Sequence, residues 1–191
     1  MRLTIARSEL ILGGQKSGKS RRAELLAREW LAQSSQHSAA LIATGQPWDD
    51  EMRERIRRHQ VDRLARVPGL ATIEEPLLLA EMIDQHSRPD HLLVVDCLTL
   101  WLTNLMMPAS GAGLGQHELE MQVVKLTQTI VSASGPVVLV GNEIGLGVIP
   151  LGREVRAFVD MLGRLNQAVA AACQRATLIA AGLPLTLKDK A

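Results

Sequence analysis

Residues 13–20 read Gly13-Gly14-Gln15-Lys16-Ser17-Gly18-Lys19-Ser20 and match the phosphate-binding pattern G-x-x-x-x-G-K-[ST]. The apolar run Leu10–Leu12 precedes this loop and a segment of helical period, Ser20–Ala32, follows it, which is the context that the pattern requires. The glycines allow successive N–H groups to point inward at a positive helix end, so that Lys19 can reach the β- and γ-phosphates and Ser20 can ligate Mg²⁺. The stretch therefore predicts a nucleoside triphosphate ligand; the alternative is a glycine-rich helix entry with a solvated lysine.

Short apolar runs alternate with helical segments along the rest of the chain. We expect strands at Leu10–Leu12, Ala39–Ala43, Leu92–Val95, Val137–Val140 and Thr177–Ala180, with a sixth at Leu185–Leu187. We expect helices over Ser20–Ala32, Asp49–Leu64, Glu118–Ser132 and Arg153–Gln174, and a surface loop over Pro108–Gln116. Near-continuous apolar strands are typical of parallel sheets that helices cover on both faces. The sequence thus predicts an α/β fold, a mostly parallel central sheet flanked by helices, in a single domain over residues 1–191.

Composition narrows the classes of partner. The 21 Lys and Arg residues balance 20 Asp and Glu, and the net charge of +1 provides no field to attract nucleic acid. Aromatic residues make up 2%, too few for base-stacking platforms. Two distant cysteines, Cys97 and Cys173, fit a reducing compartment, so we expect a cytoplasmic protein. Charges near the N-terminus and polar residues within the apolar stretches argue against a secretory signal and a membrane span.

A phosphate-binding loop of this kind also needs a carboxylate at the end of a neighbouring strand. The run Leu92–Val95 leads directly to Asp96. Asp96 is therefore the candidate that holds Mg²⁺ or its water, together with Ser20 of the loop. The alternative role is that of a turn residue at a strand end.

One histidine lies on the inward face of the second expected helix. Met52, Ile56 and His59 follow the spacing i, i+4, i+7 and share its apolar stripe. A histidine in that position either packs or takes part in phosphate chemistry. The arginines around it in the sequence favour phosphate: Arg55, Arg57, Arg58 and Arg63.

A glycine-punctuated loop follows the run Val137–Val140. It carries the polar pair Asn142 and Glu143. Because ligands bind at the carboxyl ends of parallel strands, this pair can face the acceptor of a transferred group. A plain strand-to-loop turn is the alternative.

The sequence resembles the bifunctional adenosylcobinamide kinase / adenosylcobinamide-phosphate guanylyltransferase family of cobalamin biosynthesis, from Leu10 to Lys188. The blocks that carry the resemblance are GGQKSGKS, IATGQ, DDEMRERIRRH, TIEEP, LLVVDCLTLWLTNL, VLVGNEIGLGVIP and GRLNQAVAAACQ. The resemblance implies a P-loop NTPase domain of the RecA-like type. It also implies one site with two reactions: phosphorylation of the aminopropanol hydroxyl of adenosylcobinamide, then GMP transfer from GTP through a guanylylated histidine.

The resemblance assigns roles to particular residues. His59 matches the histidine that accepts GMP, and Ser20 and Asp96 match the metal-binding pair. The implied nucleotide contacts are Gly13, Gly14, Gln15, Lys16, Ser17, Gly18, Lys19, Ser20, Thr44, Gly45, Gln46, Gln60, Val61, Asp62, Arg63, Glu74 and Asp96. The implied small molecules are GTP, with ATP as an alternative phosphoryl donor, Mg²⁺, and adenosylcobinamide and its phosphate. Relatives are trimers, which implies a homo-oligomer.

The chain departs from the family pattern after His59. Relatives have a shorter segment of the type H-R-x-x-R-P-x-x-W, whereas Leu70 stands here in place of the tryptophan. As a result, Arg63 and Arg66 are alternative matches to the arginine of the family. Two rival functions also follow from a phosphate-binding loop alone: a monofunctional small-molecule kinase, and a nucleotide-binding switch that transfers nothing.

Overall fold

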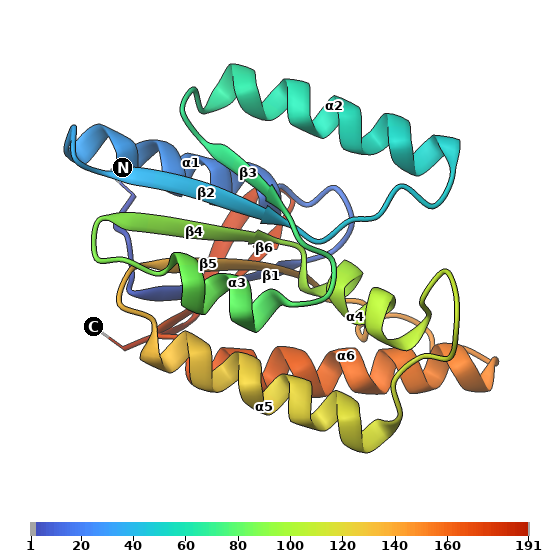
Figure 1. The fold of residues 1–191 in the computed structure, drawn as a ribbon. Helices are drawn as coiled ribbons and strands as arrows, with labels where there is room; N and C mark the ends of the chain where they lie inside the picture. The colour runs from blue at the N-terminus through green and yellow to red at the C-terminus, as the bar shows by residue number, and fades with distance from the viewer. Residues whose placement is uncertain (1–2, 191) are drawn as a thin grey trace.

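The computed structural model describes residues 3–190, apart from the side chain of Arg55. Within this part of the chain, one seven-stranded sheet has the strand order β3-β2-β4-β5-β1-β6-β7 (Figure 1). The strands are β1 (Ser8–Gly13), β2 (Ser38–Ala43), β3 (Ala71–Glu74), β4 (His91–Asp96), β5 (Val137–Asn142), β6 (Arg175–Ala180) and β7 (Leu183–Asp189). The helices are α1 (Lys19–Gln33), α2 (Asp50–Arg66), α3 (Leu79–His86), α4 (Leu98–Met106), α5 (Gln116–Ser132) and α6 (Arg153–Ala172).

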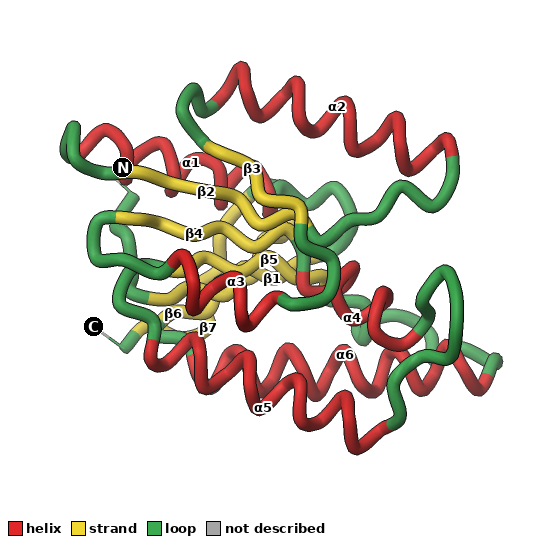
Figure 2. Tube along the Cα trace, viewed as in Figure 1, coloured by secondary structure: helices red, strands yellow, loops and turns green. Residues whose placement is uncertain are grey.

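Helices cover the sheet on two sides, with α1 and α2 on one side and α3, α5 and α6 on the other (Figure 2). Side chains alternate along each strand, so Leu10 and Leu12 enter the core under α4, α5 and α6, while Ile11 enters the core under α1. Both cores consist mainly of Leu, Ile, Val and Ala side chains. The α/β prediction with a mostly parallel sheet is therefore confirmed.

The sixth expected strand is the antiparallel edge strand β7, which pairs with β6. Lys188 of β7 caps α6, because its ammonium donates to the carbonyl groups of Ala170 at 2.7 Å, Ala171 at 2.9 Å and Cys173 at 2.5 Å. These carbonyls are among those that a helix leaves without an intrahelical partner at its C-terminus. One lysine thus joins the edge strand to the longest helix.

Three elements lie outside the expected set. The strand β3 has four residues, most of them exposed, so it lacks the apolar run that marks the other parallel strands. The helix α4 follows β4 after one residue, and the continuous apolar composition of Leu92–Met107 hides the change of period. The helix α3 has only eight residues. The ends of the expected helices differ from the observed ends by at most two residues.

Candidate active site

The carboxyl ends of the parallel strands bring the polar residues to one edge of the sheet, on the right of Figure 1. The strand register aligns Gly13 with Asn142, and it aligns Ala43 with both Asp96 and Glu74. One strand, β5, lies between β1, which leads into the phosphate loop, and β4, which ends at Asp96. Two strand spacings amount to about 10 Å. Phosphate oxygens, a metal ion and water are of the size needed to bridge such a gap.

The loop over residues 13–20 requires glycine at two places. Gly18 has a φ angle of 105°, in the left-handed region that favours glycine. A Cβ atom on Gly13 would lie 2.5 Å from the carbonyl oxygen of Ile179 and 2.6 Å from Oγ of Ser17. The loop is also tied to the β6–β7 turn, since the amide of Gly182 donates to the carbonyl of Ser17 at 3.0 Å. The backbone path is therefore fixed from two sides.

Two groups of the loop are placed for an anion. The ammonium of Lys19 bends back over the loop and donates to the carbonyl of Gly14 at 2.6 Å, with 7% of the residue exposed. The hydroxyl of Ser17 is buried and has no hydrogen-bond partner among the described residues. A buried hydroxyl without a partner is costly, and a phosphate oxygen would satisfy it. The cradle thus fits the phosphate ligand that the sequence predicts.

Lys19 and Asp96 both affect the pKa of the neighbouring Cys97 thiol. Burial, together with the negative charge of Asp96, raises the pKa of the Cys97 thiol to about 11, and the positive charge of Lys19 opposes the rise. Both charges therefore lie close to the start of α4. An ammonium and a carboxylate at one edge can hold a triphosphate together with its counter-ion.

Thr44, the first residue after β2, has a structural part in the site. Its hydroxyl donates to the carbonyl of Cys97 at 2.8 Å and accepts from the Cys97 amide at 3.0 Å. Its carbonyl accepts from the side-chain amide of Asn104 at 2.7 Å. Thr44 therefore joins the ends of β2 and β4, and its nucleotide contact stays a prediction.

The segment after Thr44 leads to the helix with the candidate histidine. A Cβ atom on Gly45 would lie 3.4 Å from Leu100 of α4 and 3.8 Å from Ile56 of α2, so α2 approaches the sheet edge at this glycine. Gln46 is half-buried beside it. His59, one turn after Ile56, is also half-buried, which places it on the inward side of α2 as the spacing predicts.

The residues that follow His59 divide between two sides of α2. The amide of Gln60 donates to Glu74 at 3.5 Å, and the guanidinium of Arg63 donates to the hydroxyl of Thr72 at 3.2 Å, so both face β3. Arg63 is 6% exposed, and its Nε is buried without a partner among the described residues. Two residues between them are exposed: Val61 and Asp62. Of the stretch Gln60–Arg63, the structure therefore brings only the two ends towards the sheet.

Arg66, the alternative match to the arginine of the family, contacts different residues from Arg63. It donates to Glu24 of α1 at 2.6 Å and to Asp62 at 3.1 Å. The hydrogen bond to Glu24 raises the pKa of the Arg66 guanidinium. Because Glu24 is buried, this ion pair fixes the end of α2 on the phosphate-loop helix. Arg66 thus serves as a link between helices, and Arg63 is the arginine that contacts β3, through Thr72.

The polar pair at the end of β5, Asn142 and Glu143, is joined directly to the phosphate loop. The amide of Glu143 donates to the carbonyl of Gly13 at 3.0 Å. The amide of Asn142 donates to the hydroxyl of Thr99 at 2.9 Å, and the carbonyl of Asn142 accepts from Asn166 at 3.1 Å. The interpretation of this pair as a plain turn is therefore incomplete, since it joins β5 to β1, α4 and α6.

Sequence reasoning missed the buried amides that hold this edge. Asn104 donates to Thr44 and to the carbonyl of Pro76, and Asn166 donates to Asn142. The sequence contained a signal for both amides, because each is a polar residue inside an apolar helical pattern. Such residues are buried only when they have hydrogen-bond partners.

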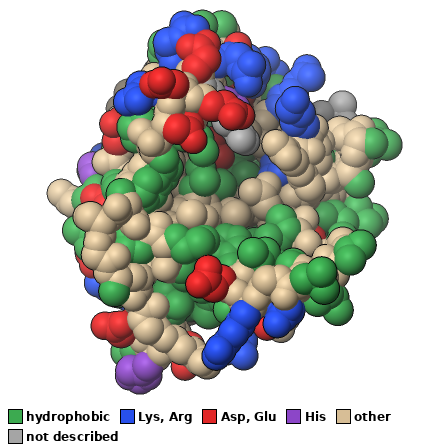
Figure 3. Space-filling view, turned by 90° about the vertical axis from the view of Figure 1, so that its right-hand side faces the viewer, with side chains coloured by type: hydrophobic (Ala, Val, Ile, Leu, Met, Phe, Trp, Pro, Cys, Tyr) green, Lys and Arg blue, Asp and Glu red, His purple; other side chains and the backbone are tan. Residues whose placement is uncertain are grey.

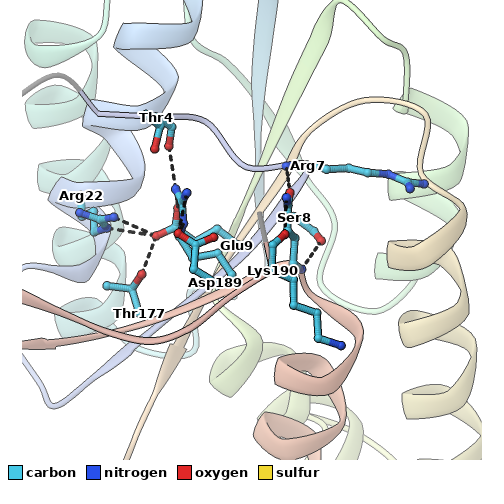
Figure 4. Close-up of polar contacts among 10 residues, drawn as sticks. Thr4, Arg7, Ser8, Glu9, Arg22, Thr177, Asp189 and Lys190 are labelled. Carbon is cyan, nitrogen blue, oxygen red and sulfur yellow. Dashed lines mark hydrogen bonds and ion pairs between the residues drawn. The ribbon is translucent and has the colours of Figure 1, made fainter.

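A buried carboxylate, Glu9, lies at the centre of a group of polar contacts on the strand that leads into the phosphate loop (Figure 4). The Glu9 side chain of β1 is 1% exposed and accepts from Arg22 of α1 at 3.0 Å and from Thr177 at 2.8 Å. Its other oxygen lies 3.6 Å from Arg175, which also pairs with Asp189 at 3.1 Å. Glu9 and Arg22 flank the loop in sequence, so one ion pair anchors both of its ends.

Figure 3 looks onto the carboxyl edge of the sheet. Charged side chains gather in its upper part, at the height of α2, and hydrophobic side chains spread across its middle and lower right. None of the helices in the described part of the chain combines the length and the hydropathy that a transmembrane segment requires.

Comparison with known proteins identifies the family. The family model "Cobinamide kinase / cobinamide phosphate guanyltransferase" matches residues 9–187. The chain belongs to this family. The family predicted from the sequence is therefore confirmed, and with it the class of enzyme, a transferase of phosphoryl and guanylyl groups.

Curated relatives of this cobinamide kinase / guanyltransferase chain cover nearly its whole length. It is 44% identical to the bifunctional adenosylcobalamin biosynthesis protein CobP of Pseudomonas aeruginosa, over 95% of this chain and 98% of the relative. It is 35% identical to the corresponding protein CobU of Escherichia coli K12, over 94% and 98%. A solved protein of Pyrococcus horikoshii OT3 shares the fold with a TM-score of 0.56 at 11% identity, covering 98% of this chain and 89% of that one.

Proposed function

We propose that this chain phosphorylates adenosylcobinamide and then transfers GMP from GTP to the product, with His59 as the intermediate acceptor of GMP. The observation that carries the proposal is the convergence of the phosphate loop, Asp96 and the Asn142–Glu143 pair on one sheet edge, in a chain of the cobinamide kinase / guanyltransferase family. All of the proposed chemistry then takes place at that edge.

In the first reaction, the hydroxyl oxygen of the acceptor attacks the γ-phosphorus, the hydroxyl proton passes to water, and the nucleoside diphosphate leaves. The loop amides and Lys19 hold the triphosphate, so positioning and charge lower the barrier without a covalent intermediate. Ser20, at the start of α1, and Asp96 are the residues that would hold Mg²⁺, which supplies charge to the phosphates when bound. Two protein ligands suit this ion, because Mg²⁺ keeps several waters and uses substrate phosphates as ligands. ATP or GTP can serve as donor.

In the second reaction, a ring nitrogen of His59 attacks the α-phosphorus of GTP and pyrophosphate leaves. A phosphate oxygen of adenosylcobinamide phosphate then attacks the same phosphorus, and the bond to His59 breaks. Neutral imidazole is a competent nucleophile for this step. The half-buried position of His59 on the inward side of α2, one turn after Ile56, supports this role.

Incubation with α-labelled GTP tests the second reaction. The unmodified protein should acquire a label that acid removes and alkali does not, as expected for a phosphoramidate. His59→Ala should acquire none but should still transfer a γ-labelled phosphoryl group to adenosylcobinamide. His117→Ala, which alters an exposed histidine on α5, is the matched control and should label fully. A fully labelled His59→Ala would contradict the proposal.

The same labels separate the rival functions. A monofunctional kinase would transfer the γ-label and form no GMP adduct. A switch protein would hydrolyse the triphosphate and leave adenosylcobinamide unmodified.

We further propose that the protein is a cytoplasmic homo-trimer. The leucines of β7 support an oligomer, because Leu183, Leu185 and Leu187 are 71%, 57% and 56% exposed at alternate positions of an edge strand. Two free, buried cysteines and the use of nucleoside triphosphates fit the cytoplasm. Sedimentation equilibrium that gave the mass of one chain would contradict the trimer.

A further inference from the structure

The loop between β5 and α6 exposes large apolar side chains at the active edge. We call residues 144–151 the apolar loop. Its four most exposed members are Leu146 at 81%, Val148 at 96%, Ile149 at 77% and Leu151 at 97%. Single exposed apolar residues are common on protein surfaces, but four in one short loop mark a surface that binds something.

The apolar loop is held in place rather than free to collapse onto the core. At its start, the Glu143 amide is bonded to Gly13 of the phosphate loop, and the Glu143 carboxylate accepts from the amide of Gly145 at 2.8 Å. At its end, the guanidinium of Arg156 donates to the carbonyls of Pro150 and Leu151. Three backbone groups of the loop, those of Gly145, Pro150 and Leu151, are thus bonded to neighbouring side chains, while the four apolar side chains are exposed to solvent.

We propose that the apolar loop is the docking surface for the corrin ring of the acceptor, an inference that rests on the proposed function. A corrin ring is a large macrocycle with broad, methyl-bearing faces, and its reactive hydroxyl lies at the end of a side arm. The nucleotide fills the phosphate loop, so the ring has to rest beside it while the arm reaches in. The apolar loop rises from that position, one hydrogen bond away from Gly13.

A second copy of this chain is the other candidate occupant of the apolar loop. The leucines of β7 provide a separate apolar surface for such a copy, on the edge strand of the sheet. The connection of the apolar loop to Gly13 favours a ligand that takes part in the reaction. The two occupants predict different results for one variant.

The test is the double variant Val148→Ser/Leu151→Ser, assayed by equilibrium dialysis with adenosylcobinamide. The dissociation constant should rise about tenfold or more, which corresponds to about 1.4 kcal/mol. Formation of the GMP adduct from α-labelled GTP, which needs no corrinoid, should be unchanged. The sedimentation coefficient should be unchanged as well. The control Val124→Ser/Val131→Ser, on exposed positions of α5, should bind adenosylcobinamide like the parent.

An unchanged dissociation constant would overturn the docking surface. A lower sedimentation coefficient of the double variant would indicate that the apolar loop contacts a second copy of the chain. That result would also overturn the docking surface. If the parent itself bound no adenosylcobinamide, the proposed function would fail first, which is distinguishable from a variant that binds as well as its parent.

Discussion

The buried carboxylate of Glu9 offers the most direct test of how the phosphate loop is held. Glu9→Gln keeps the shape of the side chain and removes its charge. Arg22 and Arg175, whose side chains are 17% and 14% exposed, would then face an uncharged amide. Removal of one partner from a buried ion pair costs about 3–5 kcal/mol, because the other charge stays buried without compensation.

The structure favours the lower end of that range. Arg175 retains Asp189 at 3.1 Å, so the loss falls mainly on Arg22. We expect Glu9→Gln to lower the free energy of unfolding by about 3 kcal/mol, a large part of the roughly 5–15 kcal/mol typical of a domain. Because Glu9 and Arg22 flank the phosphate loop, we also expect the KM for GTP to rise in the variant.

Urea denaturation followed by circular dichroism measures the loss of stability. The matched control is Glu81→Gln, which breaks the pair with Lys125, where the side chains are 38% and 50% exposed. An exposed pair of this kind contributes about 0–1 kcal/mol. The double variant Glu9→Gln/Arg22→Gln should be more stable than Glu9→Gln, since it removes the uncompensated cation. If Glu9→Gln and Glu81→Gln lost the same small amount, the buried pair would not anchor the loop.

Four further predictions test other parts of the structure. Lys19→Ala should abolish both transfer reactions, because an uncharged side chain cannot hold the phosphates; normal turnover of either would argue against one shared site. Asp96→Asn should weaken Mg²⁺-dependent turnover more than GTP binding, and an unchanged Mg²⁺ titration would exclude it from the site. Cys97, buried and with a pKa of about 11, should resist iodoacetamide at pH 8 until the protein unfolds, as mass spectrometry would report. Burial lowers the pKa of His91, so below about pH 6.5 the unfolded chain binds a proton at this residue more readily than the folded protein does. The free energy of unfolding should therefore fall as the pH falls below about 6.5, and it should fall less steeply in His91→Gln.

The sequence was sufficient for the central sheet and for the phosphate loop, for a physical reason. Strands buried on both faces have to be apolar throughout, and the loop needs glycine where its backbone turns or approaches Ile179. Each of these requirements falls on residues that are close together in the sequence, so each appears as a recognisable sequence pattern. The edge strand β3 and the helix α4 are exceptions, because an exposed edge relaxes the first requirement and a continuous apolar run conceals the start of a helix.

The hydrogen-bond partners of the site residues could not be predicted from the sequence. Nothing in the letters around Thr44 indicates that its hydroxyl is bonded to Cys97, or that Arg63 lies against Thr72 while Arg66 reaches Glu24. These contacts join residues that are distant in sequence, except for Arg63 and Thr72, and their formation depends on the relative placement of whole elements. Periodicity predicts which side of a helix faces inward, but not what it meets there.

The two proposed reactions depend to different degrees on the local phosphate loop and on the relative placement of whole elements. Apart from Asp96 at the end of β4, the groups proposed for phosphoryl transfer lie on the loop that β1, α1 and the β6–β7 turn enclose, so their geometry follows from the centre of the fold. His59 lies midway along α2, which is joined to α1 by the Arg66–Glu24 pair at its end and approaches the sheet edge near Gly45. Substitution of Arg66 should therefore disturb guanylyl transfer more than phosphoryl transfer, because it releases the helix that positions the imidazole and leaves the phosphate loop anchored through Glu9.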